Sequence, residues 1–380
     1  MKKTLFGTID QCPVYKYTLT NGVIEADILT YGGTITAVRV PDAAGRLTDV
    51  VAGWETLEDY QTKGGYMGAI MGRFGYRFET GRFTLNGVTY QVGINEAPNS
   101  LHGGVKGFDR QIWEATEAGE NTLILNYLSK DGEEGFPGNL NVTVTYTVTA
   151  ENGLAIDYKA VSDRDTVVNL TNHAYFNVAG PEATTAECIL RIDADRITPA
   201  DSALIPHNTY KDVAGTLYDF RTPSPFVKDL SADETLGKRG CYDENYVLNG
   251  EGLRAVAQVY APKSGICVTV VTDQPGMQIY TGNPRGIALE TQNFPNAVNC
   301  PDYPSAVLRS GECYHTQTIY QFEIKENVRR RLKRICGRSF AQALWLLLKK
   351  HLFAFSLPPA ERRLAATTRI TNGVVCWQVR

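Results

Sequence analysis

Two histidines and one glutamate stand in settings where their side chains could do acid–base chemistry. His102 lies in a turn-rich segment, residues 99–104, which reads Asn-Ser-Leu-His-Gly-Gly. His173 lies in residues 169–177, where asparagines interrupt an otherwise strand-like stretch, and Glu290 ends a short apolar run. Because buried polar groups need partners, such settings indicate either a hydrogen-bonded structural knot or a functional site.

A histidine and a glutamate together are suited to proton transfer. His titrates near neutral pH and Glu is normally ionised there, so one can donate a proton while the other accepts. The sequence contains no GxxxxGK[ST] phosphate loop, no GxGxxG after a strand and no GxSxG nucleophile elbow. It does contain 20 Tyr, 14 Phe and 4 Trp, rings that can stack on a sugar. The pattern favours acid–base chemistry without an evident nucleophile.

Three other charged residues are candidates whose roles the pattern leaves open. Asp243 precedes a short strand-like run, a position that is also typical of a turn aspartate. Arg73 and Arg77 lie in the glycine- and aromatic-rich stretch 72–78. The rigid fork of an arginine suits hydroxyls and carboxylates, but either arginine fits a surface position equally well.

The elements that must position these side chains read as strands. Residues 142–148 alternate apolar and polar most clearly. The pairs Asn21-Gly22, Asn86-Gly87 and Asn152-Gly153 predict hairpin turns between such runs, because a type I′ turn needs positive φ at both central residues. No helical periodicity of ten or more residues precedes residue 326. We therefore predict one all-β domain, a large antiparallel two-sheet β-sandwich.

Charge divides the chain in two. The whole sequence has a net charge of −3, yet residues 326–380 hold 12 Lys and Arg against 2 Asp and Glu, a net of +10, which leaves −13 for residues 1–325. We predict a β domain over 1–325 and a basic extension over 326–380, whose residues 339–355 are compatible with a helix. The simpler interpretation is that this extension is an appended segment with no part in the chemistry.

Composition also restricts compartment and partners. No apolar stretch approaches the ~20 residues of a membrane span, and an acidic main domain argues against nucleic acid. Eight scattered Cys without a CxxC pair make a regular zinc site or a stapled scaffold a poor match. The apolar stretch after Lys3 ends too early for a signal peptide. We expect a reduced, cytoplasmic protein that is a monomer or a homodimer.

A series of motifs resembles the aldose 1-epimerase (galactose mutarotase) family over about residues 1–325. Each motif alone is weak, but together and in this order they are specific: Gly72–Arg77, Asn99–Gly104, Glu134–Leu140, Asn169–Asn177, Asp219–Arg221, Gln278–Asn283 and Leu289–Gln292. The resemblance implies a β-sandwich with an open sugar-binding cleft. It also implies a monosaccharide substrate, whose α and β anomers are interconverted as free aldoses such as galactose and glucose. No metal and no organic cofactor is implied.

The resemblance also assigns roles by position. His173 matches the general acid, which protonates the ring oxygen, and Glu290 matches the general base, which takes the proton of the C1 hydroxyl. The ring then opens, the C1–C2 bond rotates, and the ring closes on the other face. Positions that bind sugar hydroxyls or assist at the ring oxygen correspond to Arg77, His102, Asp243 and Gln278. Tyr175, two residues after His173, would point the same way in a strand.

Two positions depart from the family pattern and leave alternatives open. Tyr76 stands where the family has a sugar-binding Asn, and Glu244 stands where His often follows the pocket Asp. Both concern the choice of sugar. The alternatives are an epimerase for hexose 6-phosphates, a non-catalytic sugar-binding sandwich, and a glycoside hydrolase that uses Asp243 and Glu290 as a carboxylate pair.

Overall fold

A computed structural model of the protein describes residues 1–325, 369–371 and 374–376. Contacts divide the chain into two units, Met1–Lys325 and Glu326–Arg380. In the second unit, the described residues form one antiparallel pair, β30 (Arg369–Thr371) with β31 (Val374–Cys376). The helix predicted over residues 339–355 lies outside the described residues.

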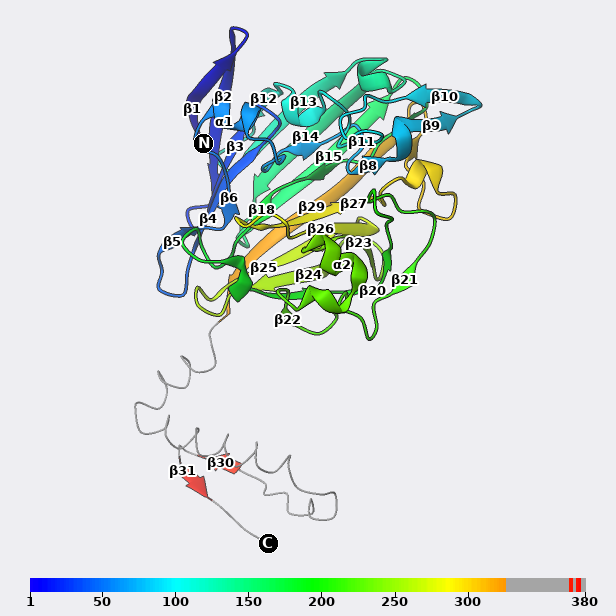
Figure 1. The fold of residues 1–380 in the computed structure, drawn as a ribbon. Helices are drawn as coiled ribbons and strands as arrows, with labels where there is room; N and C mark the ends of the chain where they lie inside the picture. The colour runs from blue at the N-terminus through cyan, green and yellow to red at the C-terminus, as the bar shows by residue number, and fades with distance from the viewer. Residues whose placement is uncertain (326–368, 372–373, 377–380) are drawn as a thin grey trace. The chain divides into compact units, whose positions relative to one another are not determined.

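Three large antiparallel sheets build the first unit (Figure 1). A five-stranded sheet contains β1 (Lys2–Ile9), β2 (Cys12–Thr20), β3 (Glu25–Leu29), β4 (Ile35–Pro41) and β5 (Leu47–Asp49). A nine-stranded sheet has the order β12 (Glu114–Glu117), β13 (Thr122–Ser129), β14 (Leu140–Val148), β15 (Gly153–Ser162), β29 (Cys313–Ile324), β25 (Ile266–Thr272), β24 (Arg254–Tyr260), β19 (Ile189–Ile192) and β22 (Ser224–Pro225). A seven-stranded sheet has the order β21 (Lys211–Asp212), β20 (Ala194–Thr198), β23 (Asp243–Leu248), β26 (Gly276–Tyr280), β27 (Ile287–Gln292), β18 (Tyr175–Phe176) and β6 (Val51–Ala52).

Four two-stranded sheets and two short helices complete this unit. The pairs are β7 (Ile70–Met71) with β17 (Thr171–Asn172), β8 (Arg77–Phe78) with β11 (Ser100–Leu101), β9 (Arg82–Leu85) with β10 (Val88–Gln91), and β16 (Thr166–Val167) with β28 (Val307–Leu308). The helices α1 (Leu57–Thr62) and α2 (Glu234–Arg239) begin where the side chains of Thr56 and Asp233 accept backbone N–H groups. Among the described residues, no helix has the length and apolar character to cross a membrane.

The nine- and seven-stranded sheets pack against each other around the main hydrophobic core. The ring of Tyr320 on β29 lies 4.5 Å from that of Phe176 on β18. The Tyr320 hydroxyl also donates to the carbonyl of Leu289 on β27, at 2.9 Å. These contacts tie one sheet to the other, and the predicted antiparallel β-sandwich is confirmed.

The three predicted hairpin turns differ in how they form. Asn86 and Gly87 join β9 to β10 with φ of 52° and 78°, as a type I′ turn requires. Asn21-Gly22 joins β2 to β3, but only Gly22 has positive φ (85°), and the side chain of Asn21 accepts the N–H groups of Val23 and Ile24, so the connection is not a type I′ turn. The prediction for Asn152-Gly153 is wrong in detail, because Asn152 (φ 65°) closes a turn onto Thr149 while Gly153 already begins β15.

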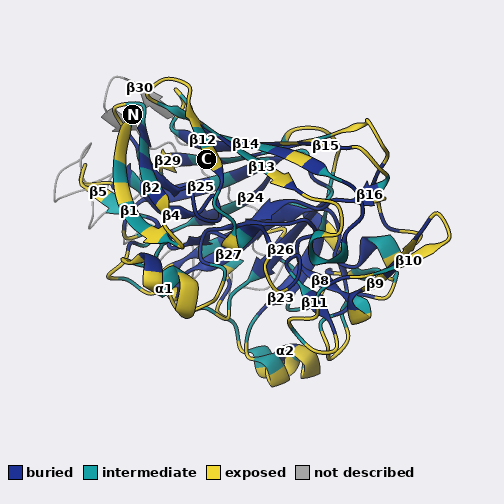
Figure 2. Cartoon of the chain, turned by 90° about the horizontal axis from the view of Figure 1, so that it is seen from above, coloured by how far each residue is buried: buried dark blue, intermediate teal, exposed yellow. Residues whose placement is uncertain are grey.

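Burial differs between the two sheets of the sandwich (Figure 2). Along β14 buried residues alternate with more exposed ones, the pattern of a sheet with one face toward water. Every residue of β27 is buried, although Glu290, Thr291 and Gln292 are among them. The seven-stranded sheet therefore holds polar side chains where water is excluded.

Candidate active site

Four of the predicted site residues project from one face of the seven-stranded sheet. Gln278 on β26 pairs with Glu290 on β27, and Asp243 on β23 pairs with Tyr280 on β26. Tyr175 on β18 pairs with Ala288, two residues before Glu290. Directly paired residues share a face and residues two apart in a strand do too, so these side chains point into one region.

His173 reaches the same region from a bend between β17 and β18. The side chain of Asn172 forms this bend, because its Oδ1 accepts the N–H of Ala174 at 2.9 Å and its Nδ2 donates to the carbonyl of Gly68 at 2.8 Å. The backbone of His173 is held by Gly68 and Ala69. Both sequence interpretations therefore apply: Asn172 makes structural hydrogen bonds, and through them it positions His173 in the site.

Tyr76 and His102 enter from two other segments and hold each other in place by hydrogen bonds. The N–H of Tyr76 donates to Nδ1 of His102 at 3.1 Å, and the N–H of His102 donates to the carbonyl of Tyr76. Both have positive φ, 63° and 53°. Since Nδ1 of His102 accepts a hydrogen bond, the proton of the neutral ring is on Nε2, which is a donor. Burial holds the pKa of His102 well below its usual value, so the ring stays neutral.

His173 and Glu290 form the centre of this site. Nε2 of His173 lies 3.6 Å from Oε1 of Glu290, and the two residues are 5% and 1% exposed. Burial lowers the pKa of His173 to about 4 and raises the pKa of Glu290 well above its ordinary value. Because burial penalises a lone charge on either group, the pair is suited to sharing a proton.

Asp243 is surrounded by donors beside this pair. Its Oδ1 accepts from the Tyr76 hydroxyl at 2.9 Å and from Nε2 of Gln278 at 2.7 Å, and its Oδ2 lies 3.7 Å from Nη1 of Arg77. Burial raises the pKa of Asp243, and the positive charge of Arg77 opposes that rise. Arg77 itself is held by two hydrogen bonds to Glu96, at 2.5 and 2.8 Å.

The structure brings all eight predicted site residues together. The His102 ring lies 5.2 Å from that of His173, and Tyr175 lies 4.8 Å from His173 on another side. Arg73, which the sequence left open beside Arg77, is buried elsewhere and donates to Ser129, to Thr166 and to backbone carbonyls including those of Pro137 and Gly138. Burial lowers its pKa to about 10, and its role is structural.

Glu244 is placed apart from the other site residues despite following Asp243 in sequence. Successive strand residues face opposite ways, and Glu244 turns toward α2, where Nη1 of Arg239 donates to its Oε1 at 2.7 Å. Burial raises the pKa of Glu244 to about 7, against the opposing charge of Arg239. The sequence interpretation that Glu244 affects the choice of sugar therefore has no direct contact behind it.

Tyr66 is a site residue that sequence reasoning missed. Its ring packs 4.6 Å from that of His102 and 5.9 Å from that of His173. Its φ of 53° is unusual for a residue with a side chain. The preceding pair Gly64-Gly65 was the available signal, because both glycines have positive φ and lead the chain into this conformation. Glu96, the partner of Arg77, was missed as well, and nothing in its local sequence marks it.

His102, His173 and Glu290 have potential metal-ligand atoms within 4.8 Å of one another. The tautomer of His102 argues against a three-ligand metal site here. Its Nδ1 lone pair accepts the N–H of Tyr76 and its Nε2 carries the proton, so neither nitrogen offers a free lone pair. The group is better suited to proton transfer than to metal binding.

Comparison with known proteins gives the family of this chain. The family model described as aldose 1-epimerase matches residues 15–321. Galactose mutarotases from Bos taurus and Homo sapiens are each 40% identical, over 82% of this chain and 94% of theirs. The aldose 1-epimerase of Escherichia coli K12 is 33% identical, over 82% of this chain and 96% of its own.

Solved structures show the same fold. An aldose epimerase homologue from C. elegans superposes with a TM-score of 0.76 at 25% identity, covering 82% of this chain and 99% of that one. Galactose 1-epimerase from Lactobacillus acidophilus NCFM has a TM-score of 0.76 at 24% identity, covering 86% of this chain and 99% of that one. The family-model match and the identities over most of both chains establish that this chain belongs to the aldose 1-epimerase family.

Proposed function

We propose that this chain interconverts the α and β anomers of free aldoses, galactose and glucose among them, with His173 as general acid and Glu290 as general base. The family membership supplies the reaction. The observation that carries the residue roles is the 3.6 Å approach of two buried groups whose pKa values are displaced in opposite directions.

The chemistry follows from one proton shared by this pair. A sugar hydroxyl that donates to Glu290 stabilises its carboxylate, so the proton of the pair moves to His173. Glu290 then takes the proton of the C1 hydroxyl while His173 gives its proton to the ring oxygen, and the C1–O5 bond breaks. After rotation about C1–C2 the transfers reverse. The proton count is unchanged over the cycle, which suits a reaction without net consumption of acid or base.

Polar atoms without partners in residues 1–325 fit a hydroxyl-rich substrate. Oε2 of Glu290, Nδ1 of His173 and Oε1 of Gln278 are buried and make no hydrogen bond there. Buried polar atoms without partners are costly, and sugar hydroxyls can both donate and accept. The protonated Nε2 of His102 adds a donor for a sugar oxygen.

Two of the alternatives meet specific obstacles. A hexose 6-phosphate needs free cations, but Arg77, whose guanidinium lies 3.7 Å from Asp243, is engaged by Glu96. A glycoside hydrolase needs a second free carboxylate, but Oδ1 of Asp243 already accepts two hydrogen bonds. A non-catalytic sugar-binding protein has no use for a His–Glu proton pair, and the assay below separates it from an enzyme.

The test is polarimetry of freshly dissolved α-D-galactose and α-D-glucose. We expect the optical rotation to relax faster than in buffer, and His173→Asn and Glu290→Gln to reduce kcat by roughly 10²- to 10⁴-fold. His207→Asn is the matched control, because His207 is exposed and pairs with Asp201. Relaxation at the buffer rate with the intact chain would refute the activity. Full activity of both site variants would refute the roles.

Three finer expectations also remain proposals. We propose that residues 1–325 fold and act without 326–380, that the protein is cytoplasmic, and that it is a monomer or a homodimer. Six cysteines of residues 1–325 are free in the structure, which suits a reducing compartment. Assaying a chain truncated after Lys325, titrating its thiols and measuring its mass in solution test the three points in turn.

A further inference from the structure

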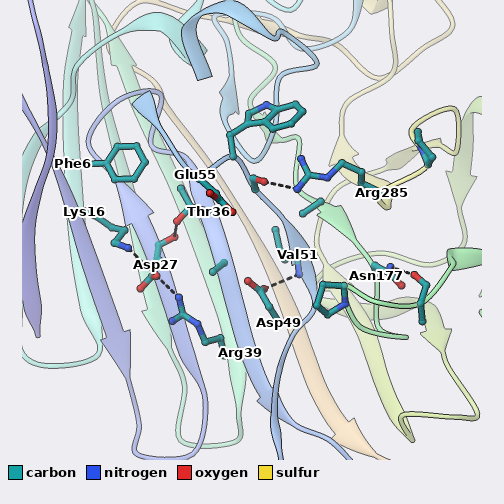
Figure 3. A pocket seen from close by; sticks show the side chains of 17 residues that line it. Phe6, Lys16, Asp27, Thr36, Arg39, Asp49, Val51, Glu55, Asn177 and Arg285 are labelled. Carbon is teal, nitrogen blue, oxygen red and sulfur yellow. Dashed lines mark hydrogen bonds and ion pairs between the residues drawn. The ribbon is translucent and has the colours of Figure 1, made fainter. Parts of the chain in front are cut away.

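A polar cavity of about 530 Å³ opens between the five-stranded sheet and the turn that follows β26 (Figure 3). Lys16, Asp27 and Arg39 line it from β2, β3 and β4, and Arg285 reaches it from the opposite wall. None of the eight predicted site residues lines this cavity. Trp54 lines it and packs in one apolar cluster with Tyr175, so this cluster separates the cavity from the catalytic site.

Some polar groups of this cavity are already engaged with one another. Asp27 is 2% exposed, and its Oδ2 accepts from Nη2 of Arg39 at 2.6 Å and lies 3.6 Å from Nζ of Lys16. Its Oδ1 accepts from the hydroxyl of Thr18. This network stiffens the sheet, and it leaves little capacity for a ligand at Asp27.

Two other groups keep unused capacity. Within residues 1–325, Arg285 has no carboxylate within 4.0 Å. Its Nη2 donates to the carbonyl of Gly53 at 2.6 Å, and its guanidinium lies 4.5 Å from the ring centre of Trp54. Asp49 accepts two backbone N–H groups on Oδ1 alone, and Oδ2 has no hydrogen-bond partner in that part of the chain. Arg285 therefore has spare donors and Asp49 a spare acceptor.

The balance of charges decides the class of ligand. The charged residues of the lining are three cations and three carboxylates: Lys16, Arg39, Arg285, Asp27, Asp49 and Glu55. A phosphate would meet carboxylates, and a metal ion would meet cations. A hydroxyl group satisfies both kinds, because it donates to a carboxylate and accepts from a guanidinium. The rings of Phe6 and Trp54 provide apolar surface for the C–H groups of a sugar.

We propose that this cavity is a second, non-catalytic binding site for a neutral saccharide, which Arg285 and Asp49 hold by hydrogen bonds. The site lies apart from the His173–Glu290 pair. Binding there requires neither anomerisation nor a free C1 hydroxyl.

The experiment uses a sugar that cannot be turned over, methyl β-D-glucopyranoside, with the full chain. The indole N–H signal of Trp54 is followed in ¹H–¹⁵N spectra and assigned by its loss in Trp54→Phe. Trp113, which is buried in the core with its N–H on the carbonyl of Phe108, is the internal reference. We expect the Trp54 signal to move along a saturable curve that Trp113 does not share.

Two variants test the cavity by different means. Arg285→Ala removes the free donors, and Ala183→Phe fills the cavity while keeping the backbone carbonyl that accepts from Asn177. We expect each to weaken the Trp54 response about ten-fold or more, with the mutarotation rate retained. Arg82→Ala, at an exposed arginine bonded to Gln91, is the matched control.

Several outcomes would overturn the proposal. A Trp54 signal that does not respond in the intact chain would do so, as would an unchanged curve in Ala183→Phe. A stronger response to sodium phosphate or acetate than to the sugar would show that the ligand class is wrong. Because the readout is binding of an inert glycoside, a failure of the proposed enzymatic activity would not produce any of these results.

Discussion

The two sheets of the sandwich differ in the length of their central strands and in how completely those strands are buried. The central strands of the nine-stranded sheet, β14, β15 and β29, are 9 to 12 residues long, and their burial largely alternates. The central strands of the seven-stranded sheet, β23, β26 and β27, are 5 or 6 residues long and buried almost throughout. Among the described residues, the seven-stranded sheet contains several buried polar side-chain atoms without partners, on Asn245, Gln278, Glu290 and Gln292, whereas the nine-stranded sheet has one, Oγ of Ser224 on its edge strand β22.

This difference indicates that the nine-stranded sheet mainly stabilises the fold, whereas the seven-stranded sheet mainly carries site residues. The nine-stranded sheet contributes more buried apolar residues to the main core than the seven-stranded sheet does. The seven-stranded sheet contains carboxylates and amides that are costly to bury without partners, and we attribute this cost to their role in binding a substrate. Substitutions in the two sheets should therefore affect different quantities.

The largest effect should come from Glu290→Gln. We expect kcat to fall roughly 10²- to 10⁴-fold. Thermal stability should be retained or increased, because an ionisable group that is buried with an unpaired oxygen is replaced by a neutral one. Polarimetry and thermal unfolding of the same preparation measure the two quantities. A large drop in Tm would place Glu290 among the groups that hold the fold.

The opposite result is expected for Ile156→Ala on β15, which is fully buried in the core. Removing its side chain should lower the free energy of unfolding by about 2–5 kcal/mol. At a temperature where the variant is folded, kcat should equal that of the intact chain. Lys159→Ala, at an exposed position of the same strand, serves as the control for denaturant unfolding. A parallel loss of kcat would show that the two sheets are not separable.

Tyr66→Ala tests whether burial tunes the catalytic histidine. The ring packs against His102 and His173, so its removal admits water and should raise the pKa of His173 from about 4 toward its ordinary value. The limb of the kcat/KM profile that reports His173 should move to higher pH. Tyr66→Phe keeps the ring and should leave the profile in place. Identical profiles for the alanine variant and the intact chain would contradict this role.

Tyr76→Asn concerns the choice of sugar. It removes a ring and a hydroxyl that occupies Oδ1 of Asp243, so both space and an acceptor become available in the cleft. We expect the ratio of kcat/KM values among galactose, glucose, xylose and arabinose to change by roughly ten-fold. Tyr76→Phe keeps the volume and should alter the ratios less. Unchanged ratios in Tyr76→Asn would mean that Tyr76 does not select the substrate.

The smallest effect is expected in the pH dependence of stability. The pKa of His173 is about 4 in the folded chain and ordinarily 6.5, so between these pH values this side chain binds a proton in the unfolded state but not in the folded state, whereas Glu290, whose pKa is raised, contributes with the opposite sign. The contribution of His173 to stability should therefore fall as the pH is lowered from 6.5 to 4, so His173→Asn should lose less stability over this range than the intact chain. Urea unfolding at several pH values measures it, with His207→Asn alongside. An equal decline in both variants would argue against a neutral buried His173.

Sequence alone indicated the fold and the three central residues of the site because their signals are local. Alternation along residues 142–148 and the Asn86-Gly87 turn follow from backbone geometry that neighbouring residues decide. The Asn152-Gly153 turn differed because Gly153 was drawn into the long pairing of β15 with β29. Without the family resemblance, only His102, His173 and Glu290 stood out clearly, and Asp243 and the arginines remained open.

The residue positions that could not be predicted from sequence depend on contacts between segments that are distant in the chain. Arg73 and Arg77 lie four residues apart in the same stretch, yet one is enclosed by the 129–138 region and the other faces Glu96 and Asp243. Tyr66 and Glu96 acquire their places only when their segments fold onto the histidines and onto Arg77. No spacing rule within the chain encodes such meetings.

The reciprocal bonds between Tyr76 and His102 have a consequence for inhibitor design. Because the backbone dictates which ring nitrogen of His102 carries hydrogen, the cleft presents a fixed donor there at any pH that leaves the ring neutral. A tight ligand must place an ether, carbonyl or hydroxyl oxygen against it. An ammonium or amide N–H at that point would face another N–H, so sugar mimics that place an N–H donor at this contact should be poor scaffolds.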